Sequence, residues 1–205
     1  MSGHWELCVD EGDVERNIWQ GIVKHVKNED RVEKPFDYIE ADKKALRLGP
    51  DQKMLYDIIR YTGLRIQEAL GLRACDIDNE QRLIIVADYE HRKLGEGIKN
   101  PSSRRKVPIS SKLFELLPDI KYQDEQLVFA RWLSATGNWN TPTFFNDRVN
   151  VRPHRMRGRV ITSLRDAGIN ERVAGDLLGH APSSNTNKYG TATIQALREA
   201  VEKIY

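Results

Sequence analysis

The chain has 205 residues, of which 40% are hydrophobic, and a formal net charge of +2. This length suits one full domain with a sizeable core plus a fragment. Its longest aliphatic run, residues 83–87, is too short to span a bilayer, and no signal peptide precedes it. Two cysteines, Cys8 and Cys75, are too few for a disulfide framework, and the five histidines show no zinc-ligand spacing. We therefore expect a soluble cytoplasmic protein with no membrane segment and no bound metal.

The first helical pattern lies near the start of the chain. Residues 14–28 carry one apolar stripe at helical spacing, made of Val14, Ile18, Trp19, Ile22, Val23 and Val26. A polar stretch and Lys34-Pro35-Phe36 follow it. The stripe predicts a helix over residues 14–28.

A second helical pattern covers residues 50–61 and ends at Thr62-Gly63. Arg65 then opens a short helix, and Glu68 lies three residues further on the same face. In that position the carboxylate of Glu68 can orient the guanidinium of Arg65. Taken alone, such a pair is more often a surface ion pair.

The middle of the chain predicts a small sheet with a basic character. Residues 82–88 form the clearest strand and residues 104–109 a second one, with a turn-rich segment between them. Residues 92–106 carry six basic side chains against one acidic, and residues 148–172 carry seven arginines against two acidic side chains. One such run would indicate a solvated face, but two runs that flank the same motifs favour a DNA-facing surface.

The last third of the chain carries two helical patterns that end at Gly168 and Gly179. Glycine takes the left-handed conformation past a helix end without penalty, so both ends are well marked. His180 therefore follows a helix end directly. Nine residues later comes Tyr189.

The first of these two helices predicts a site for a phosphate. Pro153 suits its first turn, and His154 and Arg157, three residues apart, project from one face near its N-terminus. Unpaired N–H groups and the helix dipole attract an anion there, and a guanidinium can hold two phosphate oxygens at once. The pattern indicates a phosphate site with a tyrosine nearby.

Two stretches resemble the motifs of the tyrosine recombinases, the phage integrase family. Residues 62–70, TGLRIQEAL, resemble the family's first arginine box, and residues 154–157, HRMR, with Leu178-Gly179-His180 and Tyr189 resemble its C-terminal box. The resemblance spans residues 62–189. It implies the catalytic-domain fold of that family, which is mainly α with a small antiparallel β-sheet (α+β). It also implies DNA strand cleavage and rejoining through a covalent 3'-phosphotyrosyl intermediate, without metal, ATP or any other cofactor.

The same resemblance implies a domain organisation. Residues 1–34 resemble the last helix of an N-terminal DNA-clamping (core-binding) domain with its linker, and residues 35–205 the catalytic domain. Residues 191–205 are expected to form a tail helix with an apolar stripe of Ile194, Leu197, Val201 and Ile204. A helix that short must dock to be stable. It packs on its own domain or, as the family implies, on a neighbouring protomer of a homotetramer on a double-stranded DNA recombination site, with a monomer in isolation as the alternative.

The resemblance also assigns roles to single residues. Tyr189 is the nucleophile and His154 its base or an assistant to it, while Arg65 and Arg157 hold the phosphate and His180 adds a hydrogen bond. Glu68 orients Arg65. A lysine protonates the leaving 5' oxygen, and Lys99 fits the turn better than its rivals Lys93 and Lys106. The residues expected to contact DNA are Arg104, Arg105, Lys106, Arg155 and Arg159.

Two other classes of protein fit parts of the pattern. The helix-Gly-helix of residues 154–178 fits a helix-turn-helix DNA reader without catalysis. A type IB topoisomerase would use the same groups to relax supercoils without exchanging partners. A covalent protein–DNA adduct excludes the first class, and sequence-specific joining of two sites separates a recombinase from the second.

Overall fold

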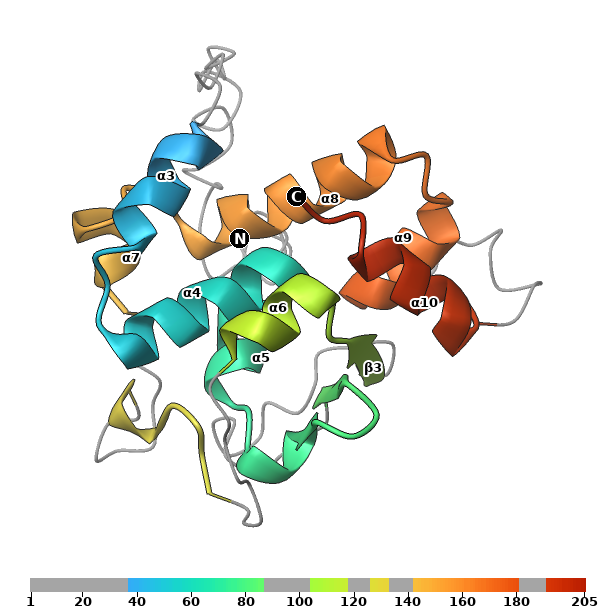
Figure 1. Cartoon of the computed structure of the whole chain (residues 1–205), viewed down its shortest axis with the longest axis horizontal. Coiled ribbons are helices and arrows are strands. Elements are labelled where there is room, and N and C mark those ends of the chain that lie inside the picture. Colours follow the sequence, from blue (N-terminus) through green and yellow to red (C-terminus); the bar gives the residue numbers. More distant parts are fainter. Residues whose placement is uncertain (1–36, 87–103, 118–125, 133–141, 181–190) are drawn as a thin grey trace, which may run out of the picture. The chain divides into compact units, whose positions relative to one another are not determined.

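The computed structural model of the chain describes residues 37–86, 104–117, 126–132, 142–180 and 191–205 (Figure 1). The predicted helix at 14–28, the lysines Lys93 and Lys99, and Tyr189 lie outside these residues. The helices and strands of the described part are α3 (Tyr38–Ala45), α4 (Pro50–Thr62), α5 (Ile66–Leu70), β1 (Ile77–Asp78), β2 (Leu83–Val86), β3 (Arg105–Pro108), α6 (Ser111–Leu116), α7 (Phe144–Asp147), α8 (Pro153–Asp166), α9 (Glu171–Leu178) and α10 (Ile194–Val201).

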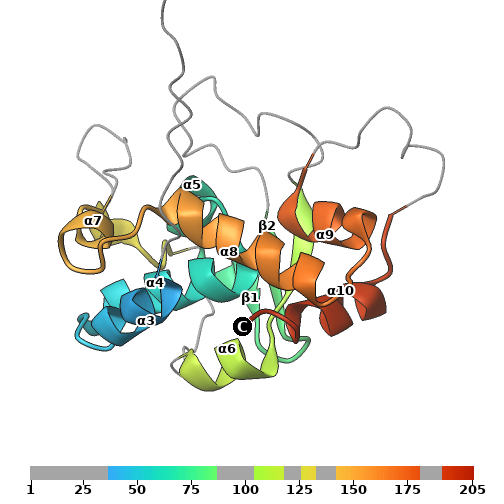
Figure 2. The same cartoon turned by 90° about the horizontal axis from the view of Figure 1, so that it is seen from above.

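Helix α4 packs against α8 in the core of residues 37–205 (Figures 1 and 2). Both helices bury aliphatic side chains at helical spacing, which are Leu55, Ile58 and Ile59 from α4 and Met156, Val160 and Leu164 from α8. Burying one such side chain stabilises the fold by about 1.5–3 kcal/mol. This helix pair is therefore the rigid support for the residues that follow α4 and for those on α8.

The helix ends follow from the local sequence. Pro50 and Pro153 each take the first position of a helix, where a missing N–H costs nothing. Gly63, with φ +66°, ends α4, and Gly179, with φ +67°, ends α9, so both take the left-handed conformation. Helix α8 ends at Asp166 with Ala167 as its C-cap, two residues before the expected glycine, and Gly168 follows with φ +69°. The helix ends predicted from the glycines are confirmed to within a residue or two.

The sheet has three antiparallel strands in the order β1-β2-β3. Ile84 pairs with Val107 in the centre, and both side chains are fully buried. Both predicted strands are present: β3 is shorter than the expected 104–109, and β2 covers 83–86 of the expected 82–88, of which residues 87 and 88 lie outside the described part. Strand β1 was not predicted because it has only two residues. The mainly helical α+β fold with a small antiparallel sheet is confirmed.

The tail helix α10 packs on its own domain, against α9 and β3 (Figures 1 and 2). Its buried face comprises Leu197, Ala200 and Val201. Glu202 accepts hydrogen bonds from the backbone N–H of Ser111, at 2.8 Å, and from its hydroxyl, at 3.0 Å. Of the apolar stripe predicted from the sequence, Leu197, Val201 and Ile204 are buried within the same chain, whereas Ile194 is 42% exposed.

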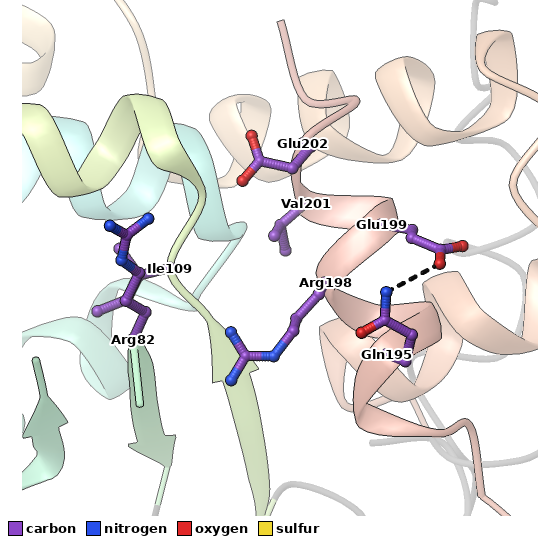
Figure 3. A pocket seen from close by; sticks show the side chains of 7 residues that line it. All are labelled: Arg82, Ile109, Gln195, Arg198, Glu199, Val201 and Glu202. Carbon is purple, nitrogen blue, oxygen red and sulfur yellow. Dashed lines mark hydrogen bonds between the residues drawn. The ribbon is translucent and has the colours of Figure 1, made fainter. Parts of the chain in front are cut away.

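A pocket lies between α10 and the strand ends of the sheet (Figure 3). Arg82 and Ile109 line one side, and Arg198 of α10 and Glu202, the C-cap of that helix, line the other. None of the residues that line it belongs to the predicted site. No helix in the described ranges is long and apolar enough to cross a membrane.

Candidate active site

Arg157 lies in the interior, one turn into α8, with 5% of its surface exposed. Its guanidinium donates to two backbone carbonyls, those of Gly63 and Leu178, each at 2.6 Å. Burial, with a smaller contribution from the nearby positive charge of Arg65, lowers the pKa of Arg157 to about 10. The side chain therefore stays charged at neutral pH and is fixed at the junction of α4 and α9.

Arg65 stands at the N-cap of α5, directly after the end of α4. Its backbone N–H donates to Glu68 at 2.9 Å and its guanidinium donates to the same carboxylate at 2.7 Å. A second guanidinium nitrogen donates to the carbonyl of Gly179 at 3.1 Å. Since 43% of the side chain is exposed, Arg65 is anchored on one side and open to a ligand on the other.

Residues 177–180, here called the α9 turn, bring the arginines together. The three consecutive carbonyls of Leu177, Leu178 and Gly179 accept hydrogen bonds from Arg105, Arg157 and Arg65 respectively, and these arginines belong to β3, α8 and the start of α5. Carbonyls at a helix C-terminus lack partners within the helix and carry partial negative charge, so cations are favoured there. The α9 turn therefore fixes the relative positions of the arginines.

Glu68 is the buried counter-ion of this group, with 2% of its side chain exposed. Burial alone would raise its pKa, but hydrogen bonds and positive charge from Arg105, together with hydrogen bonds from Arg65, outweigh burial and lower it. Arg105 donates to both carboxylate oxygens, at 3.2 and 3.0 Å. Glu68 is thus ionised at neutral pH and shared between two arginines.

The two histidines lie at helix ends near this group. The backbone N–H of His180 donates to Gly175 at 3.0 Å, which ties His180 to the end of α9, and its side chain is exposed. Burial of part of the ring and the positive charges of Arg157, Arg65 and Arg105 lower the pKa of His180. The imidazole is therefore neutral at pH 7 and can donate one hydrogen bond. His154 is exposed in the first turn of α8, one turn before Arg157.

The five expected DNA contacts are divided by the structure into two groups. Arg104 is exposed directly before β3, Lys106 is exposed on β3, and Arg155 is half-buried on α8. The guanidiniums of Arg105 and Arg159 point into the domain, which differs from the expectation. The reason for Arg105 is the alternation along β3, because Arg105 lies on the same face as the buried Val107. That alternation was the signal in the sequence that could have separated Arg105 from its exposed neighbours.

Arg159 belongs to a separate ion-pair network centred on Asp42, which the sequence did not indicate. Asp42 accepts from Arg159 at 2.9 Å, from Arg60 through two bonds of 2.8 Å, and from the hydroxyl of Tyr56 at 2.7 Å. Burial alone would raise the pKa of Asp42, but the hydrogen bonds from Arg60 and Tyr56 outweigh it and lower the pKa. The network joins α3, α4 and α8, so in this structure Arg159 is bonded within the domain, whereas the sequence predicted it at the DNA.

The arrangement can hold a tetrahedral anion without a metal. Arg65 and Arg157 supply fixed positive charge, and His180 supplies a neutral donor beside them. Among the described residues no group of three or more His, Cys, Asp or Glu side chains is placed to hold a metal ion.

A mainly helical domain with a small antiparallel sheet and two arginines brought together at one site is the arrangement that the resemblance to the phage integrase family implies. A sequence model of the phage integrase family matches residues 26–195, and the chain belongs to that family. The resemblance stated from the two motifs is therefore confirmed.

Several known proteins are similar to the chain. Tyrosine recombinase XerA of Thermococcus onnurineus is 29% identical over 180 residues, which cover 80% of this chain and 60% of that protein. Tyrosine recombinase XerD of Mycobacterium tuberculosis is 29% identical over 171 residues, covering 72% and 50%. The chain thus spans between half and three fifths of the length of these relatives.

Two solved integrases have the same fold. The Tn1549 transposon integrase, solved in complex with a circular intermediate DNA, aligns over 100% of this chain and 76% of its own with a TM-score of 0.63 and 19% identity. The integrase of mycobacterium phage Brujita aligns over 100% and 69% with a TM-score of 0.58 and 18% identity.

Proposed function

We propose that this protein is a site-specific DNA recombinase that cleaves and rejoins DNA strands through a 3'-phosphotyrosyl bond to Tyr189. The observation that carries the proposal is the anchoring of Arg65 and Arg157 on consecutive carbonyls of the α9 turn. Two guanidiniums fixed by the backbone hold an anion without reorganising, which is the requirement for stabilising a phosphorane-like transition state.

In the proposed reaction, the oxygen of Tyr189 attacks phosphorus and the bond from phosphorus to the 5' oxygen breaks. A phenol with a pKa near 10 attacks slowly unless its proton is removed, and His154 is the group proposed to accept it. Arg65 and Arg157 hold the non-bridging oxygens, and the neutral imidazole of His180 donates a hydrogen bond to one of them. Lys99 gives a proton to the leaving 5' oxygen. Attack by a 5' hydroxyl from another strand reverses the step, so no ATP is needed.

The partner that we propose is a double-stranded DNA recombination site in the cytoplasm, bound through the exposed Arg104 and Lys106 and the half-buried Arg155. We further propose a homotetramer on DNA in which α10 is exchanged between protomers. Such an exchange would first break the hydrogen bonds of Glu202 to Ser111 and of Arg198 to the carbonyl of Gln81. We therefore expect an isolated chain to be a monomer with α10 on its own domain.

A DNA reader without catalysis is the weaker reading. A recognition helix presents its side chains outward to base edges. In a helix-turn-helix that role falls to the second helix, which here is α9. Its eight residues include Glu171 and Asp176 against a single basic side chain, Arg172. This composition disfavours α9 as a DNA-reading helix.

A nicked suicide substrate that carries the recombination site tests the proposal. Loss of the short 5' fragment prevents resealing, so the wild-type protein should accumulate a denaturation-resistant adduct at Tyr189, with or without EDTA. Tyr189→Phe should form none. Tyr205→Phe, which removes the hydroxyl of an exposed tyrosine, is the matched control and should form the adduct normally. An adduct with Tyr189→Phe, or a requirement of the wild type for Mg²⁺, would refute the mechanism.

A further inference from the structure

Arg105 contacts both the α9 turn and Glu68, the carboxylate that holds Arg65, although its side chain does not face solvent. Only 6% of its side chain is exposed. One nitrogen donates to the carbonyl of Leu177 at 2.8 Å, and the other two donate to Glu68 at 3.2 and 3.0 Å. Its planar guanidinium therefore bridges the start of the α9 turn and the carboxylate that holds Arg65.

The contact with Glu68 determines where the positive charge of Arg65 can lie. Glu68 is buried, and its two oxygens are each shared between Arg65 and Arg105. If Arg105 were absent, the buried carboxylate would lack its second cation and would draw Arg65 inward or take up a proton. Either change would move the guanidinium of Arg65 away from its present position at the surface.

The contact with the carbonyl of Leu177 fixes the position of the α9 turn. Gly179 is left-handed and brings the backbone close to Arg105, since a Cβ at this position would lie 2.6 Å from a guanidinium nitrogen of Arg105. His180 is the next residue in the chain. Any shift of the α9 turn would therefore move the ring of His180 and the carbonyl of Gly179 that orients Arg65.

The strand that carries Arg105 is a firm base for both contacts. β3 is paired with β2 along its length, and Val107 on the same face is fully buried in the core. The side chain of Arg105 is thus held by the sheet at one end and by two fixed acceptors at the other.

We propose that Arg105 is a positioning residue for the reaction: it fixes Arg65 through Glu68, fixes His180 through the α9 turn, and does not contact DNA. The proposal rests on the function proposed above. It replaces the expectation that Arg105 belongs to the DNA-binding surface.

Measurements of DNA cleavage and of DNA binding distinguish a positioning role of Arg105 from a direct contact with DNA. In single-turnover cleavage at saturating DNA, Arg105→Gln should lower the rate about 10²-fold, the size of effect produced by a displacement of roughly 1 Å in a reacting group. The affinity for DNA and the slope of log K against log salt should stay as in the wild type. A lost phosphate contact would instead change that slope by about 0.9. A normal rate with a changed slope would overturn the proposal.

A conservative variant guards against failure to fold. Arg105→Lys keeps a positive charge beside Glu68, but one ammonium group cannot reach both carboxylate oxygens and the carbonyl of Leu177 in the same fork geometry. We expect a smaller loss of rate than for Arg105→Gln, with a melting temperature close to that of the wild type. If Arg105→Lys cleaved at the wild-type rate, charge alone would suffice and the positioning role would be wrong.

Coupling to Glu68 distinguishes positioning from a general loss of stability. If Arg105 acts through Glu68, the fold-loss in rate of the double variant Arg105→Gln/Glu68→Gln should be smaller than the product of the two single losses. Arg131→Gln removes an exposed arginine that pairs with Asp51 and should change neither rate nor coupling. Losses that multiply in the double variant would overturn the proposal.

Hydrogen exchange tests the geometry without DNA or catalysis. The amides of Gly179 and His180 donate within the end of α9, so in Arg105→Gln their exchange should accelerate more than that of the core amides of α4 and α8. If the wild type formed no adduct, the proposed function would fail while exchange still reported on positioning. If the adduct formed and these amides exchanged at the wild-type rate in Arg105→Gln, the positioning role alone would fail.

Discussion

Gly63 is the position where a single added carbon should disturb both the core and the site. It ends α4 with φ +66°, and its carbonyl accepts from Arg157. The left-handed backbone costs a residue with a Cβ about 1–2 kcal/mol. The Cβ of alanine would lie 2.6 Å from a methyl carbon of Leu178 and 3.2 Å from one of Val160. Both neighbours are buried, and relieving such overpacking costs about 1–3 kcal/mol.

Together these contributions predict that Gly63→Ala lowers the free energy of unfolding by about 2–5 kcal/mol, against a total of roughly 5–15 kcal/mol for a domain. At about 2–4 °C per kcal/mol, the melting temperature should fall by roughly 4–20 °C. Calorimetry or circular dichroism would measure the change.

Gly168→Ala is the matched control for that measurement. Gly168 has φ +69°, but a Cβ there would meet no atom within 4 Å. Its replacement should therefore cost only the backbone contribution of about 1–2 kcal/mol. If Gly63→Ala and Gly168→Ala lowered the melting temperature by the same amount, the packing part of the argument would be refuted.

Two further predictions concern the scaffold and the leaving group. Asp42→Ala should lower the free energy of unfolding by about 2–4 kcal/mol, less than for a fully buried ion pair because 30% of the carboxylate side chain is exposed. Folding lowers the pKa of Asp42. The stability that Asp42 contributes is therefore present above its unfolded pKa, near 3.8, and is lost as the pH falls below that value. The wild type should lose this part of its stability in acid, whereas Asp42→Ala should not. Lys99→Ala should slow cleavage about 10²- to 10⁴-fold on normal DNA but little on a substrate with a bridging 5' sulfur, whose thiolate leaves without a proton. Selective rescue of Lys93→Ala instead would show that the general acid is Lys93.

Local signals predicted the parts of the fold that depend on a few neighbouring residues. Gly63 and Gly179 marked two helix ends because the left-handed conformation favours glycine. Alternation along residues 104–109 indicated that the side chain of Arg105 points inward. The run of basic residues at 92–106 was nevertheless interpreted as one exposed surface. The network of Asp42 could not be predicted, because its partners Arg60 and Arg159 lie 18 and 117 residues away.

The carbonyl acceptors of the α9 turn could not be predicted from the sequence either. Every residue has a carbonyl, so no residue type distinguishes Leu177, Leu178 and Gly179 as partners for three arginines. The two boxes identified Arg65 and Arg157 as a pair, but only the folded chain reveals what anchors them.

The anchors also set when the pair can form during folding. Arg65 lies 114 residues from its acceptor Gly179, and Arg157 lies 94 residues from Gly63. Contacts that distant require the intervening chain to be ordered first, and they form late compared with local helices. A ribosome-bound chain that has not yet reached residue 179 already contains both arginines, yet it lacks the carbonyl that orients Arg65. The arrangement that fixes Arg65 therefore requires the chain to have been made through residue 179.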